Sequence, residues 1–186
     1  IAAILDAFPD LRDGMLAGQS YAGMIGTAVA DRIGKHLKHL VYVDAVIPRQ
    51  GESWSSTQSA ATQQQRMAAA QASTRFSFPP PDPEKFGLKG ADHAWVGRRQ
   101  TPHPGHTYQA TLNFDVRRVA AVPRTFISCT EPALATIDPS RLRAKDPKFW
   151  DGAWLSSGFV EIKTGHDPMI SEPAALAKIM LDCAAA

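Results

Sequence analysis

Apolar side chains follow two different periods over the first 43 residues of the chain. Residues 1–11 read as the end of a helix, and residues 15–18 form a short apolar run. From Tyr21 to Ile33, apolar side chains recur at steps of three and four residues, the period of an amphipathic helix. Residues 40–43 are all apolar, as is typical of a parallel strand that is covered on both faces. The pattern therefore predicts a strand, a helix and a second strand parallel to the first.

The last third of the chain repeats this alternation of strands and helices. Residues 125–129 and 158–163 are predicted to be strands, and a helix is expected near residues 140–145. Residues 172–185 carry the apolar stripe of a final helix, which Ser171 is expected to cap. Strands that alternate with helices indicate an α/β fold with a parallel sheet.

The middle of the chain has a different character. Residues 57–73 are rich in Ala and Gln and are predicted to be helical. Residues 78–90 contain four prolines and are expected to be extended or looped. Residues 92–112 mix aromatic side chains, three histidines and prolines without clear periodicity.

These patterns divide the chain into two predicted parts. Residues 1–50 and 123–186 form the α/β core, and residues 51–122 are inserted over the sheet as a cap. A chain of 186 residues that is 44% hydrophobic is long enough to bury one sizeable core, which fits a single domain with an insertion.

Charge and cysteine usage narrow the class of protein further. The net charge is only +2, from 20 basic and 18 acidic residues, so nothing favours nucleic acid or an anionic membrane surface as a partner. No apolar run approaches the roughly 20 residues that cross a bilayer. The two cysteines, Cys129 and Cys183, are too few for a disulfide framework and are read as buried free thiols. We therefore expect a cytoplasmic protein without a membrane partner.

Ser20 stands between the first predicted strand and the helix that follows it. A serine hydroxyl is a poor nucleophile at neutral pH and needs an adjacent base, and it must protrude from the sheet to reach a substrate. A sharp turn from strand to helix achieves this, and Gly18, Ala22 and Gly23 provide the small side chains that let the two elements approach closely. The backbone N–H of Tyr21 is then a candidate oxyanion donor. The competing interpretation is an ordinary serine at a helix N-terminus.

His166 is the candidate base for this serine. It follows the last predicted strand directly, and Asp44 ends the strand at residues 40–43. Because parallel strands present their active groups at their carboxyl ends, Ser20, Asp44 and His166 are expected at one edge of the sheet. By contrast, His36 and His39 lie in a basic loop and are expected to be solvated.

Three segments of the chain resemble one family. Residues 18–24 (GQSYAGM) resemble the G-H-S-Y-G-G turn of α/β-hydrolases, with Gln19 in place of the usual histidine. Residues 40–48 (LVYVDAVIP) are similar to the strand and exit loop that follow this turn, and residues 164–169 (TGHDPM) resemble the segment around the catalytic histidine. The most similar branch comprises small esterases related to plant methylesterases and hydroxynitrile lyases.

The resemblance covers residues 15–49 and 123–186 and implies an α/β-hydrolase fold. It implies a serine esterase that works through an acyl-enzyme, with no metal or other cofactor. Family members also carry earlier strands and an HG-type loop that donates the second oxyanion N–H. Because the sequence reaches Ser20 almost at once and starts without Met, we expect it to be a piece of a longer chain.

Three carboxylates are candidates for the third member of a catalytic triad, which orients the histidine. Family members place this residue either after the strand that precedes the cap or after the strand that follows it. Asp44 fits the first position and is preferred, and Glu131 and Asp138 fit the second.

Substrate recognition is expected to come from the predicted cap. Gln19, Trp54 and Trp95 are the predicted substrate-binding residues, and the wider set of cap aromatics that could line an apolar pocket comprises Trp54, Phe76, Phe78, Trp95 and Tyr108. The expected substrate is a small or medium apolar ester. The spacing of His93, His103 and His106 matches no metal-binding pattern, so no metal is expected.

Two other functions compete with ester hydrolysis. A hydroxynitrile lyase uses the same triad to deprotonate a cyanohydrin and typically needs a cap lysine near the serine, for which Lys85 and Lys89 are the candidates. The other alternative is an inactive relative, truncated or ligand-binding, with a silent triad.

Overall fold

A four-stranded parallel sheet forms the centre of the protein. The computed structural model describes residues 12–152, 154 and 158–185, so the helix expected in residues 1–11 lies outside the described residues. The strands of the sheet are β1 (Gly14–Gln19), β2 (Leu37–Val43), β5 (Arg124–Cys129) and β6 (Gly158–Ile162), in the order β1-β2-β5-β6. Each neighbouring pair runs parallel, which confirms the expected α/β class and all four predicted strands.

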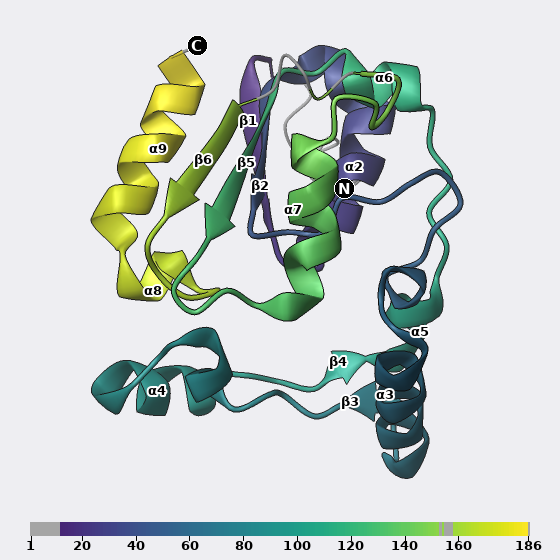
Figure 1. Cartoon of the computed structure of the whole chain (residues 1–186), viewed down its shortest axis with the longest axis vertical. Coiled ribbons are helices and arrows are strands. Elements are labelled where there is room, and N and C mark those ends of the chain that lie inside the picture. Colours follow the sequence, from purple (N-terminus) through teal and green to yellow (C-terminus); the bar gives the residue numbers. More distant parts are fainter. Residues whose placement is uncertain (1–11, 153, 155–157, 186) are drawn as a thin grey trace.

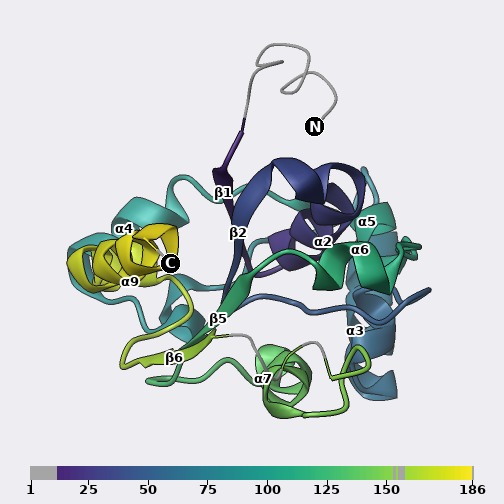
Figure 2. The ribbon, with the colours of Figure 1, turned by 90° about the horizontal axis from the view of Figure 1, so that it is seen from above.

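Alternate side chains of the central strands enter two separate cores. Leu40 and Tyr42 of β2 pack in one core with α2 (Ala22–Ile33), and Val41 and Val43 pack in the other core with α9 (Pro173–Ala185). Figure 2 shows α9 on one side of the sheet and α2 with α7 (Asp138–Lys145) on the other. The continuous apolar run in β2 is therefore explained by burial on both faces.

The long connection between β2 and β5 carries the remaining elements. They are η2 (Ser55–Thr57), α3 (Ala60–Ala72), β3 (Ser77–Phe78), η3 (Pro83–Phe86), α4 (Gly90–Gly97), β4 (His103–Pro104), α5 (Gly105–Gln109) and α6 (Val116–Ala120). In Figure 1, α3, β3, β4 and α4 lie beyond the carboxyl ends of β5 and β6, whereas α6 lies beside α2, with which it makes contact. The cap predicted for residues 51–122 therefore includes a final part that packs on the core.

Helices α4 and α5 lie in the part of the chain where the sequence shows no clear periodicity. Within residues 92–112, α4 ends at Gly97 and α5 begins at Gly105. Both are short, at 8 and 5 residues, so neither has room to display a clear apolar period. None of the helices in the described part of the chain is long and apolar enough to cross a membrane.

Two smaller expectations were wrong. Ser171 does not cap the last helix: it ends the short helix α8 (Pro168–Ser171), and its hydroxyl bonds to Thr164 and to the carbonyl of Asp167. His39 is not solvated, because β2 begins at Leu37 and carries His39 into the sheet. Its Nε2 lies 2.9 Å from Oγ1 of Thr125 on the neighbouring strand.

Candidate active site

Ser20 occupies a strained turn between β1 and α2. Its φ is +56°, in the left-handed region that residues other than glycine rarely adopt. The turn is fixed by its backbone: the N–H of Ser20 donates to the carbonyl of Val43 (3.3 Å), and its carbonyl accepts from the N–H groups of Gly23 (3.2 Å) and Val46 (2.9 Å). These three bonds hold a conformation that the serine alone would not favour.

The glycines beside Ser20 are required by close approach of the backbone. A Cβ on Gly18 would lie 2.7 Å from the carbonyl oxygen of Ala22, and one on Gly23 would lie 2.1 Å from the carbonyl oxygen of Val46. Atoms cannot pack at these distances, so a side chain at either position would displace the turn. The small residues of the sequence pattern thus act as expected, by letting strand, helix and the following loop meet.

Asp44 directly follows β2 in a second left-handed conformation, with φ of +43°, and is fully buried. Its backbone N–H donates to the carbonyl of Ile127 (2.7 Å). One carboxylate oxygen, Oδ2, lies 2.7 Å from Nδ1 of His166. The other, Oδ1, accepts from the N–H of Cys129 (3.2 Å) and from Nη2 of Arg141 (2.7 Å). Both oxygens of this buried carboxylate are therefore hydrogen-bonded.

Arg141 of α7 neutralises the buried charge of Asp44. Its guanidinium also donates to the carbonyls of Cys129 and Leu134, to Oγ of Ser128 and to Oδ1 of Asp138 (2.6 Å). A buried carboxylate is tolerated only when it is paired and hydrogen-bonded, and Arg141 supplies both conditions. The sequence analysis did not single out this arginine.

The three carboxylates considered for the triad therefore differ in their surroundings. Asp44 is hydrogen-bonded to His166, Asp138 is bound to Arg141, and the side chain of Glu131 is exposed at the surface. Near Asp44, burial and the aspartate charge raise the pKa of the Cys129 thiol to about 12, so this thiol stays protonated at neutral pH.

The loop after β6 places His166, which is only 3% exposed. Its ring centroid lies 5.2 Å from that of Phe86, and Nε2 of Gln19 donates to its carbonyl (3.0 Å). The Gln19 amide also donates to Oδ1 of Asp167 (3.3 Å). Burial is the main cause that raises the pKa of the Asp167 carboxyl group. Gln19 thus ties the end of β1 to the histidine loop.

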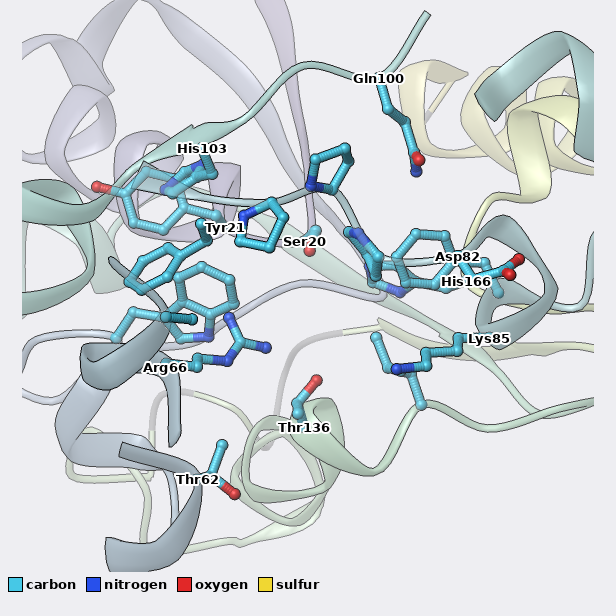
Figure 3. A pocket seen from close by; sticks show the side chains of 18 of the residues that line it. Ser20, Tyr21, Thr62, Arg66, Asp82, Lys85, Gln100, His103, Thr136 and His166 are labelled. Carbon is cyan, nitrogen blue, oxygen red and sulfur yellow. The ribbon is translucent and has the colours of Figure 1, made fainter. Parts of the chain in front are cut away.

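A cavity of about 840 Å³ opens over these groups. Of the predicted site residues, Gln19, Ser20, Tyr21, Trp54 and His166 all line it. Figure 3 shows the Ser20 hydroxyl at the inner end of this pocket, between Tyr21 on one side and His166 on the other. Trp95 does not line this pocket: it is 43% exposed, and the guanidinium of Arg99 lies 4.2 Å from its ring centroid.

Sequence reasoning missed much of the outer wall. Helix α3 contributes four lining residues at helical spacing, namely Thr62, Gln65, Arg66 and Ala69. This spacing marks one helix face and could have been found in the sequence, but the face is polar rather than apolar and so gave no core signal. Phe86 and Lys85, from the proline-rich stretch, line the same cavity.

The three histidines of residues 92–112 have separate partners. His103 lines the cavity and packs edge-on against the rings of Tyr21 and Trp54. His93 bonds to Asp82 at 2.7 Å, and His106 packs on Phe76. Across the described residues, no group of three or more His, Cys, Asp or Glu side chains could hold a metal ion.

Comparison with known proteins places this fold and site in a family. The sequence matches the profile of the alpha/beta hydrolase family over residues 1–179. The chain belongs to this family. A carbendazim-hydrolysing esterase from Nocardioides sp. (strain SG-4G) is 32% identical over 179 residues, which cover 91% of this chain and 70% of that esterase. The chain is therefore an enzyme of the hydrolase class, related to esterases.

Solved structures agree on the fold. An extracellular α/β-hydrolase from a Paenibacillus species has a TM-score of 0.77 at 20% identity, covering 98% of this chain and 77% of its own. The Arabidopsis methylesterase MES16 has a TM-score of 0.68 at 16% identity, with 98% and 74% covered. These α/β-hydrolase neighbours include the plant methylesterases that the sequence motifs resemble.

Proposed function

We propose that this hydrolase cleaves carboxylic esters through a triad of Ser20, His166 and Asp44. The observation that carries the proposal is the hydrogen bond of 2.7 Å between Asp44 and Nδ1 of a histidine that shares one pocket with Ser20. The ionised carboxylate accepts from Nδ1–H, so the other ring nitrogen, Nε2, lacks a proton and can accept one. Neutral imidazole in this tautomer is a general base for a hydroxyl.

The chemistry then runs in two stages. As the Ser20 oxygen bonds to the ester carbonyl carbon, its proton passes to Nε2 of His166, and Asp44 stabilises the imidazolium that forms. The bond between the carbonyl carbon and the alkoxide oxygen then breaks, and His166 returns the proton to the alkoxide, which leaves as the alcohol. The acyl group remains on Ser20 as an acyl-enzyme. Water then attacks the acyl group by the same proton route and releases the acid. The N–H of Tyr21, at the start of α2, is the proposed donor to the oxyanion in both stages.

The proposed substrate is a small or medium ester with apolar parts. Trp54, Phe78 and Phe86 give the cavity apolar walls, and its volume of about 840 Å³ suits a ligand of that size. Residues 51–122 are the proposed cap, because most of the cavity wall outside the sheet comes from them. We also propose a cytoplasmic location, since Cys129 and Cys183 are both free and buried.

Covalent labelling tests the nucleophile. A fluorophosphonate should phosphonylate the protein once, and peptide mass mapping should place the label on Ser20. The Ser20→Ala variant should lose both the label and the hydrolysis of p-nitrophenyl butyrate. The matched control is Ser77→Ala, which removes a half-buried hydroxyl of β3 that bonds to Ser73. If a folded Ser20→Ala variant hydrolyses the ester as well as the unaltered protein does, the proposal is contradicted. If the unaltered protein takes no label and hydrolyses no ester, it is the inactive relative.

Lys85 supports hydroxynitrile lyase activity as a second candidate function. Of the two lysines in residues 51–122, Lys85 lines the cavity, and Figure 3 shows its amine reaching in from the side opposite Arg66. In this reaction the base removes the cyanohydrin O–H proton, the C–C bond breaks, and cyanide leaves with a proton supplied by the site, giving an aldehyde and HCN. The lyase is favoured over the esterase if the protein releases cyanide from mandelonitrile, if Lys85→Met abolishes this release, and if no acyl-enzyme forms.

A further inference from the structure

Arg66 stands out among the residues that line the cavity. It lies on the inner face of α3, and Figure 3 shows its guanidinium directed into the space below Ser20. The carbon of the guanidinium lies 4.7 Å from the ring centroid of Trp54 and 5.3 Å from that of Tyr108. Both rings are buried. Stacking on two aromatic rings fixes the direction of the guanidinium while leaving its N–H groups available.

No carboxylate among the described residues forms an ion pair with Arg66. Two other arginines of the molecule differ in this respect: Arg141 is paired with Asp44, and Arg143 with Glu52. Asp82, the acidic side chain of the cavity wall, is occupied by His93 at 2.7 Å and by the N–H of Glu84 at 2.9 Å. Burial against the aromatic rings lowers the pKa of Arg66, so its charge lacks part of the stabilisation that water would give.

The cavity wall carries other charged side chains besides Arg66. Lys85 places a second cation on the opposite wall. The cavity thus combines apolar surface with an arginine that forms no ion pair within the described residues, and these features are complementary to an anionic oxygen group.

We propose that Arg66 binds a carboxylate on the substrate, so that the preferred ester carries a free carboxylate on the part that extends from Ser20 toward α3. This inference rests on the proposed ester hydrolysis and names its substrate class. A guanidinium recognises a carboxylate with two parallel N–H bonds, which gives orientation as well as affinity. The ester is thereby held with its carbonyl at Ser20 and its charge at the far wall.

The test compares two esters that differ in charge at the end of the acyl chain. One is mono-p-nitrophenyl glutarate, which ends in a carboxylate, and the other is p-nitrophenyl pentanoate, which ends in a methyl group. The protein should prefer the glutarate in kcat/KM, and Arg66→Met should reduce the ratio of the two values about 10- to 100-fold, mainly through KM. Arg66→Lys should recover part of the ratio. The control Arg75→Met, an exposed arginine just beyond α3, should leave the ratio unchanged.

Three results would overturn the inference. They are an unchanged ratio in Arg66→Met, no preference for the glutarate in the unaltered protein, and an equal loss of the ratio in Lys85→Met, which would show a diffuse field rather than one binding group. A binding measurement separates this failure from failure of the proposed hydrolysis. Calorimetry with monomethyl glutarate on Ser20→Ala and Ser20→Ala/Arg66→Met proteins should show binding to the first and weaker binding to the second, whether or not either ester is cleaved.

Discussion

The strand-end site and the outer wall of the cavity are built in different ways. At the ends of β1 and β2, Ser20 and Asp44 are fixed by backbone hydrogen bonds in left-handed conformations. On the outer wall, Arg66 and Lys85 are long side chains on α3 and η3, and Arg66 is positioned by contacts with two aromatic rings. The backbone thus holds the first region in place, as the proposed proton transfer requires. The second offers shape and charge that can change without disturbing the fold.

On the proposed function, this difference assigns the chemistry to the strand ends and the substrate selectivity to the outer wall. Changes at the strand ends should reduce catalysis toward every substrate. Changes on the outer wall should alter the ranking of substrates and spare the common chemistry.

The largest effect is expected from Asp44→Asn. An amide at this position can present its N–H to Nδ1 of His166 and so favour the wrong tautomer, which should lower kcat about 10⁴-fold for neutral and anionic esters alike. Asp138→Asn is the matched control, since Asp138 is exposed and bonds to Arg141 from the outside. Steady-state kinetics of both variants decides the point, and similar losses in the two would remove Asp44 from the triad.

Gly23→Ala should disturb the turn itself. The new Cβ would meet the carbonyl oxygen of Val46 at 2.1 Å, so the loop after Asp44 must move. We expect a loss of about 100-fold in kcat and of about 2–3 kcal/mol in the free energy of unfolding. Gly26→Ala on the same helix is the control, because its Cβ would meet only the end of the Leu40 side chain at 3.4 Å. Urea unfolding with parallel kinetics measures both quantities, and equal behaviour of the two variants would contradict the steric account.

Arg141→Lys should separate positioning from stability. A lysine keeps the charge beside Asp44 but cannot also reach Ser128, Asp138 and the backbone carbonyls, so we expect kcat to fall about tenfold and stability by about 1–2 kcal/mol. Arg143→Lys breaks a comparable fork, to Glu52 and the carbonyl of Ile47. It should lose similar stability and keep its kcat. If kcat falls equally in both variants, Arg141 has no special role in orienting Asp44.

The smallest expected effect is that of Asp167 on the pH dependence of stability. Because burial raises its pKa in the folded protein, the folded state binds this proton more tightly than the unfolded state does. The contribution of Asp167 to stability therefore falls as pH rises from the unfolded pKa, about 4, through the raised folded pKa. Asp167→Asn keeps the acceptor for Gln19, so its Tm should match the unaltered protein at low pH and exceed it increasingly toward pH 7. A Tm difference that shrinks as pH rises would reverse the sign of this account.

The residues that the sequence could and could not predict follow the same division. The sequence could predict the strands, the turn at Ser20 and the histidine loop, because backbone geometry restricts which residues fit there. Gly23 is an example, since a side chain at this position would displace the turn. Arg141 was not, since it reaches Asp44 across 97 positions of sequence and no local pattern marks an ion pair. Trp95 was expected in the cavity from its type alone, and the structure instead packs it under Arg99 at the surface. Where a side chain of a surface helix packs depends on tertiary contacts, which the periodicity of the sequence does not show.

The most direct test of the strand-end site is a cycle of phosphonylation rates at Ser20. The second-order rate constant for a fluorophosphonate is measured for the unaltered protein, His166→Ala, Asp44→Asn and the double variant, by intact mass against time. If Asp44 acts only through His166, the double variant should react as slowly as His166→Ala alone and no slower. Losses that multiply in the double variant would show that the carboxylate and the imidazole act independently, and the triad would not exist as proposed.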